Sequence, residues 1–153
     1  MLESSSSAPT RSEIEIEVRY AETDQMGVVH HANYLVWFEL ARTRLCARSG
    51  YHYAQIEELG YFLMVTAVDV EYRKGARYGD AVRVTAWIER LSSRGLTFGY
   101  EVFCGDQQLA MGSTQHVWVE IATNKPRRMP EVLREPFERL VGEGARRSKA
   151  LSD

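Results

Sequence analysis

A carboxylate, a glycine and two adjacent histidines fall within eight residues of this chain: Asp24, Gly27, His30 and His31. In an arbitrary loop an aspartate most simply caps a turn, but its carboxylate can also act as a general base or a nucleophile. His31 lies where an apolar helical pattern begins, and the first amides of a helix are unpaired donors that favour a developing negative charge. The segment from Tyr20 to Gly50 therefore joins candidate chemistry directly to candidate core.

The other titratable residues have simpler interpretations. The pair His30 and His31 has neither an i, i+4 histidine partner nor an evident third ligand, so no metal site is predicted. His30 is interpreted as a surface or packing residue, and His116, in the middle of an extended segment, as structural. Glu39 is expected on the polar side of the helix, where a salt bridge is favoured over catalysis.

The helix that must position this loop is marked by spacing. Apolar residues recur at the i, i+3, i+4, i+7 interval at Tyr34, Trp37, Phe38, Ala41 and Leu45. Only a narrow polar strip remains, made by Glu39, Arg42, Thr43 and Arg48. Asn33 is expected to be the N-cap, and Gly50 to end the helix. A helix with so much apolar surface is expected to be enclosed by a curved sheet or by a partner chain.

Extended segments surround this helix. The sequence EIEIEVRY alternates strictly from Glu13 and predicts a half-buried strand. After a short helical turn within 51–60, four more strands are predicted at Phe62–Tyr72, Asp80–Leu91, Leu96–Cys104 and Gln107–Ile121. Their connections contain glycine beside polar residues and are short, which favours antiparallel neighbours. A closing helix is predicted from Glu131 to Val141.

This order predicts one α+β domain, in which an antiparallel sheet of about five strands wraps around a long central helix. The domain is expected to cover residues 13–141, after a disordered N-terminal arm (1–12) and before a flexible tail (142–153). One helix covers only part of one sheet face, so a homodimer or homotetramer is expected.

The composition excludes several classes of function. The chain has 153 residues, 44% hydrophobic and 26% charged, with a formal net charge of -2. A near-neutral chain without a clustered basic face lacks the main attraction for nucleic acid. No apolar run reaches the ~18 residues that cross a membrane, and the N-terminus lacks a signal-peptide core. Cys46 and Cys104 are expected to be reduced thiols, and the protein to be cytoplasmic.

The string RYAETDQMGVVHHANYLVWFELAR closely resembles the signature of hotdog-fold acyl-CoA thioesterases of the 4-hydroxybenzoyl-CoA thioesterase type. The matching positions are Tyr20, Asp24, Gly27, Val28, Val29, His31, Asn33 and Tyr34. At the level of elements, the resemblance extends from about Glu13 to Ile121. It implies hydrolysis of a thioester to a carboxylate and a free thiol, without a metal or a redox cofactor.

The resemblance also implies roles for residues. Asp24 matches the catalytic carboxylate, as nucleophile or as general base, and the amide of His31 would donate to the thioester oxygen. Gly27 would allow close backbone approach. The remaining motif positions are assigned to substrate binding: Tyr20, Val28, Val29, Asn33 and Tyr34. The two valines would keep the pocket dry.

The phosphates of coenzyme A require positive charge. By alignment of turns, Ser92, Ser93 and Arg94 fall where the family places such contacts, although only Arg94 is charged. The alternative suppliers are Arg73, Lys74 and Arg77.

Several functions are weighed against a short- to medium-chain or aryl acyl-CoA thioesterase. Because few charged residues are predicted to bind the phosphates of coenzyme A, an acyl carrier protein in fatty-acid or polyketide synthesis is an alternative thioester donor. A hotdog hydratase or dehydratase is disfavoured, because the proline- and glycine-rich stretch around its histidine is missing. A non-catalytic acyl-CoA binding module would not need Asp24.

Overall fold

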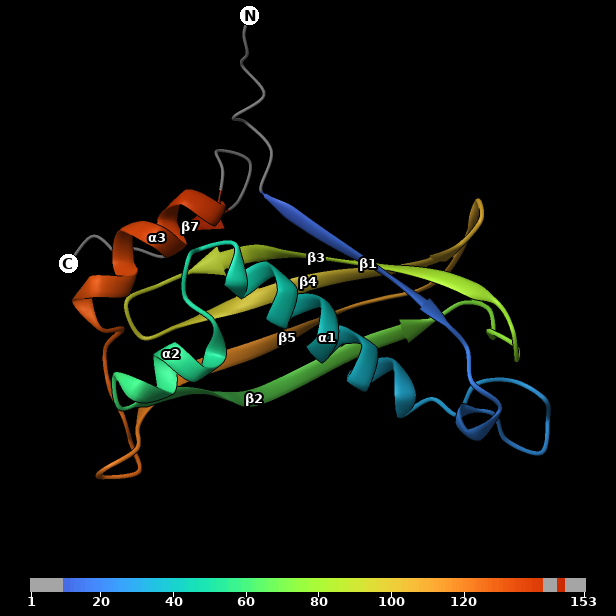
Figure 1. The fold of residues 1–153 in the computed structure, drawn as a ribbon, viewed down its shortest axis with the longest axis horizontal. Coiled ribbons are helices and arrows are strands. Elements are labelled where there is room, and N and C mark those ends of the chain that lie inside the picture. The colour runs from blue at the N-terminus through green and yellow to red at the C-terminus, as the bar shows by residue number, and fades with distance from the viewer. Residues whose placement is uncertain (1–9, 142–145, 148–153) are drawn as a thin grey trace, which may run out of the picture.

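The computed structural model describes residues 10–141 and 146–147 (Figure 1). The helical elements are η2 (Tyr20–Glu22), α1 (Asn33–Ala47), α2 (Tyr53–Glu58) and α3 (Glu131–Val141). The strands are β1 (Arg11–Glu17), β2 (Tyr61–Tyr72), β3 (Ala81–Leu91), β4 (Gly95–Cys104), β5 (Gln107–Glu120), β6 (Lys125–Pro126) and β7 (Arg146–Arg147). The observed bounds of β2 to β5 differ from the predicted ones by at most one residue at each end, and α3 has the predicted bounds. Strand β1 covers 11–17, whereas the alternating pattern covers 13–20.

The sheet is antiparallel along the order β1-β3-β4-β5-β2, with α1 lying across one face (Figure 1). Two-residue β6 extends it beside β5, and β7 pairs in parallel with β3. The predicted α+β architecture, a sheet of about five strands around a long helix, is confirmed. Strands β1 and β2 are the edges, so they are the places where the sheet has unpaired backbone groups.

Helix α1 rests closely on the middle of the sheet. Phe38 stacks on Tyr100 of β4, with ring centroids 4.2 Å apart and planes 3° apart. It also lies over Gly112 of β5, where an added Cβ would meet the ring of Phe38 at 3.1 Å and the carbonyl of Asp69 at 2.4 Å. Burying a phenylalanine contributes roughly 2–3 kcal/mol. Gly112 therefore lets the helix and the edge strand β2 approach β5 at the same point.

The N-terminal strand begins earlier than the alternation predicts. Arg11 and Ser12 belong to β1, whereas the sequence pattern predicts them in the disordered arm. Ser12 is buried, and the guanidinium of Arg11 lies 4.1 Å from the ring centre of Trp87 on β3. These long-range contacts leave no trace in the local pattern. Residues 1–9, 142–145 and 148–153, which make up most of the predicted arm and tail, lie outside the described residues.

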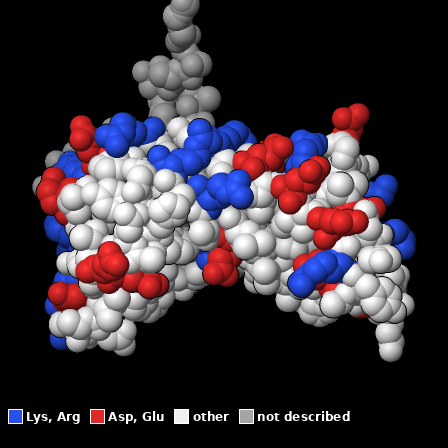
Figure 2. Space-filling model, viewed as in Figure 1, with Lys and Arg blue, Asp and Glu red and all other residues white. Residues whose placement is uncertain are grey.

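The polar strip predicted on α1 is wrong at Arg42, which is only 9% exposed. The helix instead turns apolar residues outward: Leu35, Val36 and Leu40 are exposed. Glu39 is exposed, and the predicted salt bridge is not formed within the part of the chain that the structure describes. On the face shown in Figure 2, cationic and anionic side chains are interspersed with uncharged surface.

Arg42 belongs to a buried polar group, the Arg42 cluster, formed with Tyr100, Thr114 and His116. Arg42 Nη1 donates to the Tyr100 hydroxyl at 3.4 Å, which lies 2.6 Å from the Thr114 hydroxyl, itself 2.8 Å from His116 Nε2. Burial lowers the pKa of His116 to about 4, and the positive charge of Arg42 adds to the effect. His116 is thus neutral and internal, in agreement with its structural interpretation.

Candidate active site

The loop from Tyr20 to His31, called here the Asp24 loop, folds back on itself before α1. Thr23 bridges to Val29, the Asp24 amide donates to the Val28 carbonyl at 2.9 Å, and the Gly27 amide donates to the Asp24 carbonyl at 3.0 Å. Gly27 has a φ of 81°, a conformation that favours glycine. Its presence in the motif therefore has a local physical reason.

The Asp24 side chain shapes the tip of this loop. Its Oδ1 accepts a hydrogen bond from the Met26 amide at 2.8 Å, an arrangement that aspartates commonly make in turns. The residue is exposed, and no basic side chain forms an ion pair with it within the described residues. The Asp24 carboxylate can therefore stabilise the turn and still be accessible to a substrate.

The segment 73–79 supports the loop. The Val29 amide donates to the Ala76 carbonyl at 2.8 Å, and the Ala76 amide lies 3.4 Å from the Tyr34 hydroxyl. Gly75 lies against Val28, because a Cβ there would be 2.8 Å from a valine methyl group. Val28, Val29 and Tyr34 thus hold the loop on the protein as well as lining the site.

His31 presents an unpaired amide. Its carbonyl oxygen accepts hydrogen bonds from the Tyr72 hydroxyl at 3.0 Å and from the Tyr34 amide at 3.2 Å. Its own N–H has no acceptor among residues 10–141. The imidazole stacks on that of His30 at 4.3 Å and is exposed. The His31 backbone is therefore held through its carbonyl oxygen, while its N–H, which the sequence predicts as the donor to the thioester oxygen, has no acceptor in the described chain.

Asp24 and His31 line one open cavity of about 340 Å³. The other lining residues are Val28, Val29, Tyr34, Tyr72, Arg73, Lys74 and Gly75. A second cavity, about 540 Å³, lies on the other side of Asp24 and is lined by Tyr20, Thr23, Gln25, Gly27 and Tyr78. Of the three predicted catalytic residues, Asp24 and His31 therefore line a common cavity, whereas Gly27 lines the other one together with Tyr20.

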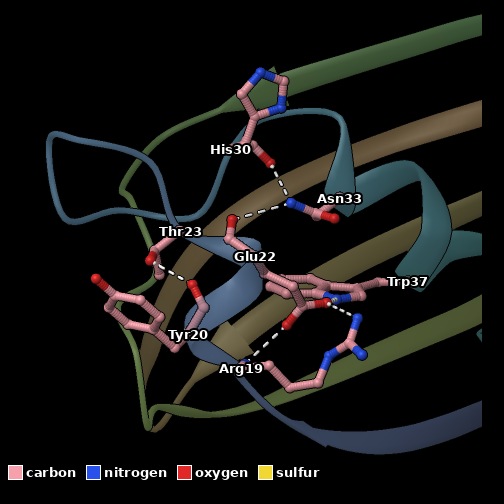
Figure 3. A network of polar contacts seen from close by, with 7 residues as sticks. All are labelled: Arg19, Tyr20, Glu22, Thr23, His30, Asn33 and Trp37. Carbon is pink, nitrogen blue, oxygen red and sulfur yellow. Dashed lines mark hydrogen bonds and ion pairs between the residues drawn. The ribbon is translucent and has the colours of Figure 1, made fainter.

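Asn33 is not the N-cap that the sequence predicts. It is the first residue of α1, the N-cap is Ala32, and no side chain caps the helix. The Asn33 side-chain amide instead donates to the carbonyl oxygens of Glu22 at 3.0 Å and His30 at 3.3 Å (Figure 3). It binds the two ends of the Asp24 loop together, a role that depends on contacts no sequence pattern reports.

The two sets of candidate phosphate ligands lie at opposite ends of the sheet. Arg73 and Lys74 line the cavity with Asp24. Strand β3 begins beside the Asp24 loop and runs for 11 residues, roughly 35 Å, before the turn with Ser92, Ser93 and Arg94 (Figure 1). Within that turn the Ser92 hydroxyl accepts from the amides of Arg94 and Gly95. A single chain therefore does not bring these three residues to the Asp24 cavity.

Two residues of the site have no counterpart in the sequence predictions. Tyr72, at the end of β2, donates to the His31 carbonyl, and Glu22 is buried near the beginning of the Asp24 loop. Tyrosine at a strand end carries no signal that would identify it. Among the described residues, no three side chains of His, Cys, Asp or Glu are grouped so as to hold a metal ion. No helix within this part of the chain is long and apolar enough to cross a membrane.

Comparisons with known proteins agree on one family. The model of the thioesterase-like superfamily matches residues 18–137. The protein named "Putative acyl-CoA thioesterase YneP" of Bacillus subtilis is 40% identical over 116 residues, 75% of this chain and 84% of that protein.

Two solved structures have the same fold. A hypothetical protein from Thermus thermophilus superimposes with a TM-score of 0.80 and 39% identity, over 86% of this chain and 98% of its own. A DHNA-CoA thioesterase from Staphylococcus aureus gives a TM-score of 0.79 and 37% identity, over 85% and 88% of the two chains. The residues matched by the family model include the Asp24 loop, α1 and strands β2 to β5.

Proposed function

Because the chain belongs to the thioesterase-like superfamily, we infer that it hydrolyses acyl-CoA thioesters to a free carboxylate and coenzyme A. The observation that supports roles for particular residues is that Asp24 and His31 line one cavity, and that the His31 N–H has no acceptor among the described residues. A carboxylate and an oxyanion donor on one cavity are the two groups that thioester hydrolysis requires. The reaction needs no cofactor, since coenzyme A is part of the substrate.

Asp24 acts on the thioester carbonyl carbon in one of two ways. As a general base, it takes a proton from a water molecule whose oxygen attacks that carbon. As a nucleophile, its own oxygen attacks, and water then hydrolyses the resulting anhydride. In both routes the C–S bond breaks, and the electron pair leaves with the coenzyme A sulfur. A single turnover in ¹⁸O-labelled water separates the routes. The general-base route puts one ¹⁸O into the product carboxylate, whereas the nucleophilic route, with water attacking the Asp24 carbon of the anhydride, gives an unlabelled product and puts ¹⁸O into Asp24.

The His31 amide stabilises the oxygen on which negative charge develops. Its position at the beginning of the 15-residue helix α1 adds the partial positive charge of the helix end. Removing one such donor from an enzyme typically costs about 10²–10³ in rate. Val28 and Val29 line the same cavity and limit the water around the reacting carbonyl.

Arg73 and Lys74 are the cations best placed to meet the phosphates within one chain. Lys74 has no ion-pair partner in the described part of the chain, whereas Arg73 lies 3.3 Å from Glu71. The role of Ser92, Ser93 and Arg94 requires a second copy of the chain. Antiparallel pairing of two β2 edges would bring the turn of one chain towards the Asp24 loop of the other.

A homodimer of this kind is supported by the surface of β2. The strand is an edge of the sheet, and it exposes Met64, Val65, Val68 and Tyr72. An exposed apolar edge strand invites pairing with another strand. Sedimentation would give at least twice the chain mass of 17.5 kDa if the pairing occurs, and the mass of one chain if it does not.

The test of the function is thiol release from a panel of acyl-CoAs by the wild type and by Asp24→Asn. The amide keeps the shape of the side chain but can neither attack nor take the proton, so we expect at least a ~100-fold loss of kcat. The matched control is Asp106→Asn, which makes the same chemical change in the exposed turn between β4 and β5.

Two outcomes would contradict the proposal. An Asp24→Asn variant with wild-type kcat would remove Asp24 from the reaction. A wild type that releases no thiol from any acyl-CoA would exclude that substrate class, and acyl carrier protein thioesters would then be tested. Inactivity on both would favour a binding module.

A further inference from the structure

Glu22 is a carboxylate with an unusual setting. It lies in η2, two residues before Asp24, and it is only 4% exposed. One carboxylate oxygen accepts from the Arg19 amide at 2.9 Å, and the other accepts from the Trp37 indole at 3.1 Å (Figure 3). The Arg19 guanidinium lies 3.5 Å away. Burial alone would raise the pKa of Glu22, but these partners together lower it, so the group is an anion at neutral pH.

The backbone of the same residue binds the other end of the loop. The Glu22 carbonyl oxygen accepts from the His30 amide at 2.8 Å and from the Asn33 side chain at 3.0 Å. Trp37 is buried in the second turn of α1. Glu22 therefore connects the beginning of the Asp24 loop, the end of that loop and the helix (Figure 3).

These contacts determine where the His31 N–H points. In a trans peptide the C=O and the N–H point in opposite directions. The carbonyl of the His30–His31 peptide accepts from the Asn33 amide at 3.0 Å and from the Asn33 side chain at 3.3 Å. With that oxygen turned towards α1, the N–H of the same peptide is directed away from it. The Asn33 side chain that fixes this oxygen is itself fixed by Glu22.

We propose that Glu22 is a positioning residue, which sets the orientation of the His31 amide by holding the loop ends and Asn33 against Trp37. This inference rests on the proposed function. A carboxylate suits the task because it only accepts hydrogen bonds, and two donors converge on it. A glutamine would turn its NH₂ towards one of these donors. The Trp37 indole or the Arg19 amide would then lose its partner.

The test is Glu22→Gln, with Glu17→Gln as the matched control on an exposed glutamate of β1. We expect kcat to fall at least tenfold while KM changes less than threefold, because the hydrogen bond from the His31 amide to the thioester oxygen strengthens as negative charge develops on that oxygen in the transition state. The melting temperature reports whether the variant is folded. Thiol release by the wild type is measured first, since an inactive wild type overturns the proposed function itself.

A spectroscopic readout separates orientation from general destabilisation. In Asp24→Asn with bound acyl-CoA, a hydrogen bond from His31 lowers the stretching frequency of the thioester carbonyl, isolated by ¹³C labelling. Adding Glu22→Gln is expected to reduce this shift by half or more.

Hydrogen exchange gives a second readout that needs no activity. In Glu22→Gln, exchange at residues 30–33 should accelerate at least tenfold while β3 and β4 stay unchanged. An active wild type with an unaltered kcat in Glu22→Gln would overturn the inference about Glu22 alone, as would an unaltered carbonyl shift or unaltered exchange at residues 30–33.

Discussion

Polar groups gather at two places along α1, and they differ in how they are satisfied. In front of the helix, the Asp24 loop exposes a carboxylate and leaves the His31 amide without an acceptor in the described chain. Under the middle of the helix, the Arg42 cluster is enclosed, and its hydroxyl and imidazole groups bind one another. The first place has donors and acceptors to offer to a ligand. In the Arg42 cluster, most of the donors and acceptors are bonded to one another.

This difference shows that a shifted pKa alone does not locate the site. The strongest shifts lie near the Arg42 cluster, where burial raises the pKa of Cys46 to about 12 and lowers that of His116 to about 4. Structural networks shift pKa values as active sites do. The cavity and the unpaired amide identify the Asp24 loop instead. If the two places have separate roles, changes in the Arg42 cluster alter stability alone and changes in the Asp24 loop alter activity alone.

The largest effect concerns His116 and pH. The pKa of His116 is about 4 in the folded protein and near 6.5 in the unfolded chain. Between these two pH values the unfolded chain binds a proton at His116 and the folded protein does not. Stability from this group is present above pH 6.5 and is lost as the pH falls to about 4. At 1.36 kcal/mol per pKa unit, the loss is roughly 3 kcal/mol. Urea unfolding of wild type and His116→Gln at pH 7, 5.5 and 4.5 should give a flatter dependence for the variant. Parallel curves would contradict the assignment, and the exposed His52→Gln is the control.

The next effect is that of Tyr100→Phe. Loss of this hydroxyl leaves buried Arg42 and Thr114 without their shared partner, which should lower the free energy of unfolding by about 1–3 kcal/mol. The kcat should stay within twofold of the wild type at a temperature where both are folded. A Tyr61→Phe control removes a hydroxyl that makes no hydrogen bond within the described residues. A large fall in kcat with unchanged stability would contradict the separation of roles between the Arg42 cluster and the Asp24 loop.

The smallest effect is that of Tyr72→Phe, on the loop side. The lost hydrogen bond to the His31 carbonyl is worth about 0.5–1.5 kcal/mol, which corresponds to a roughly 2- to 10-fold fall in kcat. Tyr72 is partly exposed, so the melting temperature should barely change. Tyr78→Phe, whose hydroxyl is unbonded in the described structure, serves for comparison. Equal kcat values for both variants would remove Tyr72 from the support of His31.

Local pattern is sufficient to predict the long strands and the α-helices of this fold. The alternation in β3 places Val82, Val84, Ala86 and Ile88 on one buried face, and the helical spacing identifies the buried face of α1. Arg42 could not be predicted, because its burial depends on Tyr100, 58 residues away on β4. The burial of Ser12 could not be predicted for the same reason, because it depends on the pairing of β1 with β3.

The site shows the same limit. The motif identifies Asp24 and His31, and the structure brings them to one cavity. The sequence also predicts Asn33 as the N-cap of α1, but the actual partners of this side chain depend on how the Asp24 loop folds. Glu22 cannot be identified from the sequence, because its partner Trp37 lies 15 residues further along, a separation that no helical or strand periodicity marks.

Gly112 has a consequence for attempts to change what this protein accepts. Any side chain there would collide with the Asp69 carbonyl and with Phe38, so it would separate α1 and β2 from β5 together. In a directed-evolution experiment, codon 112 should stay invariant under selection for altered substrate size. Useful diversity should appear instead at cavity-lining positions such as Val28, which can change volume without moving either layer.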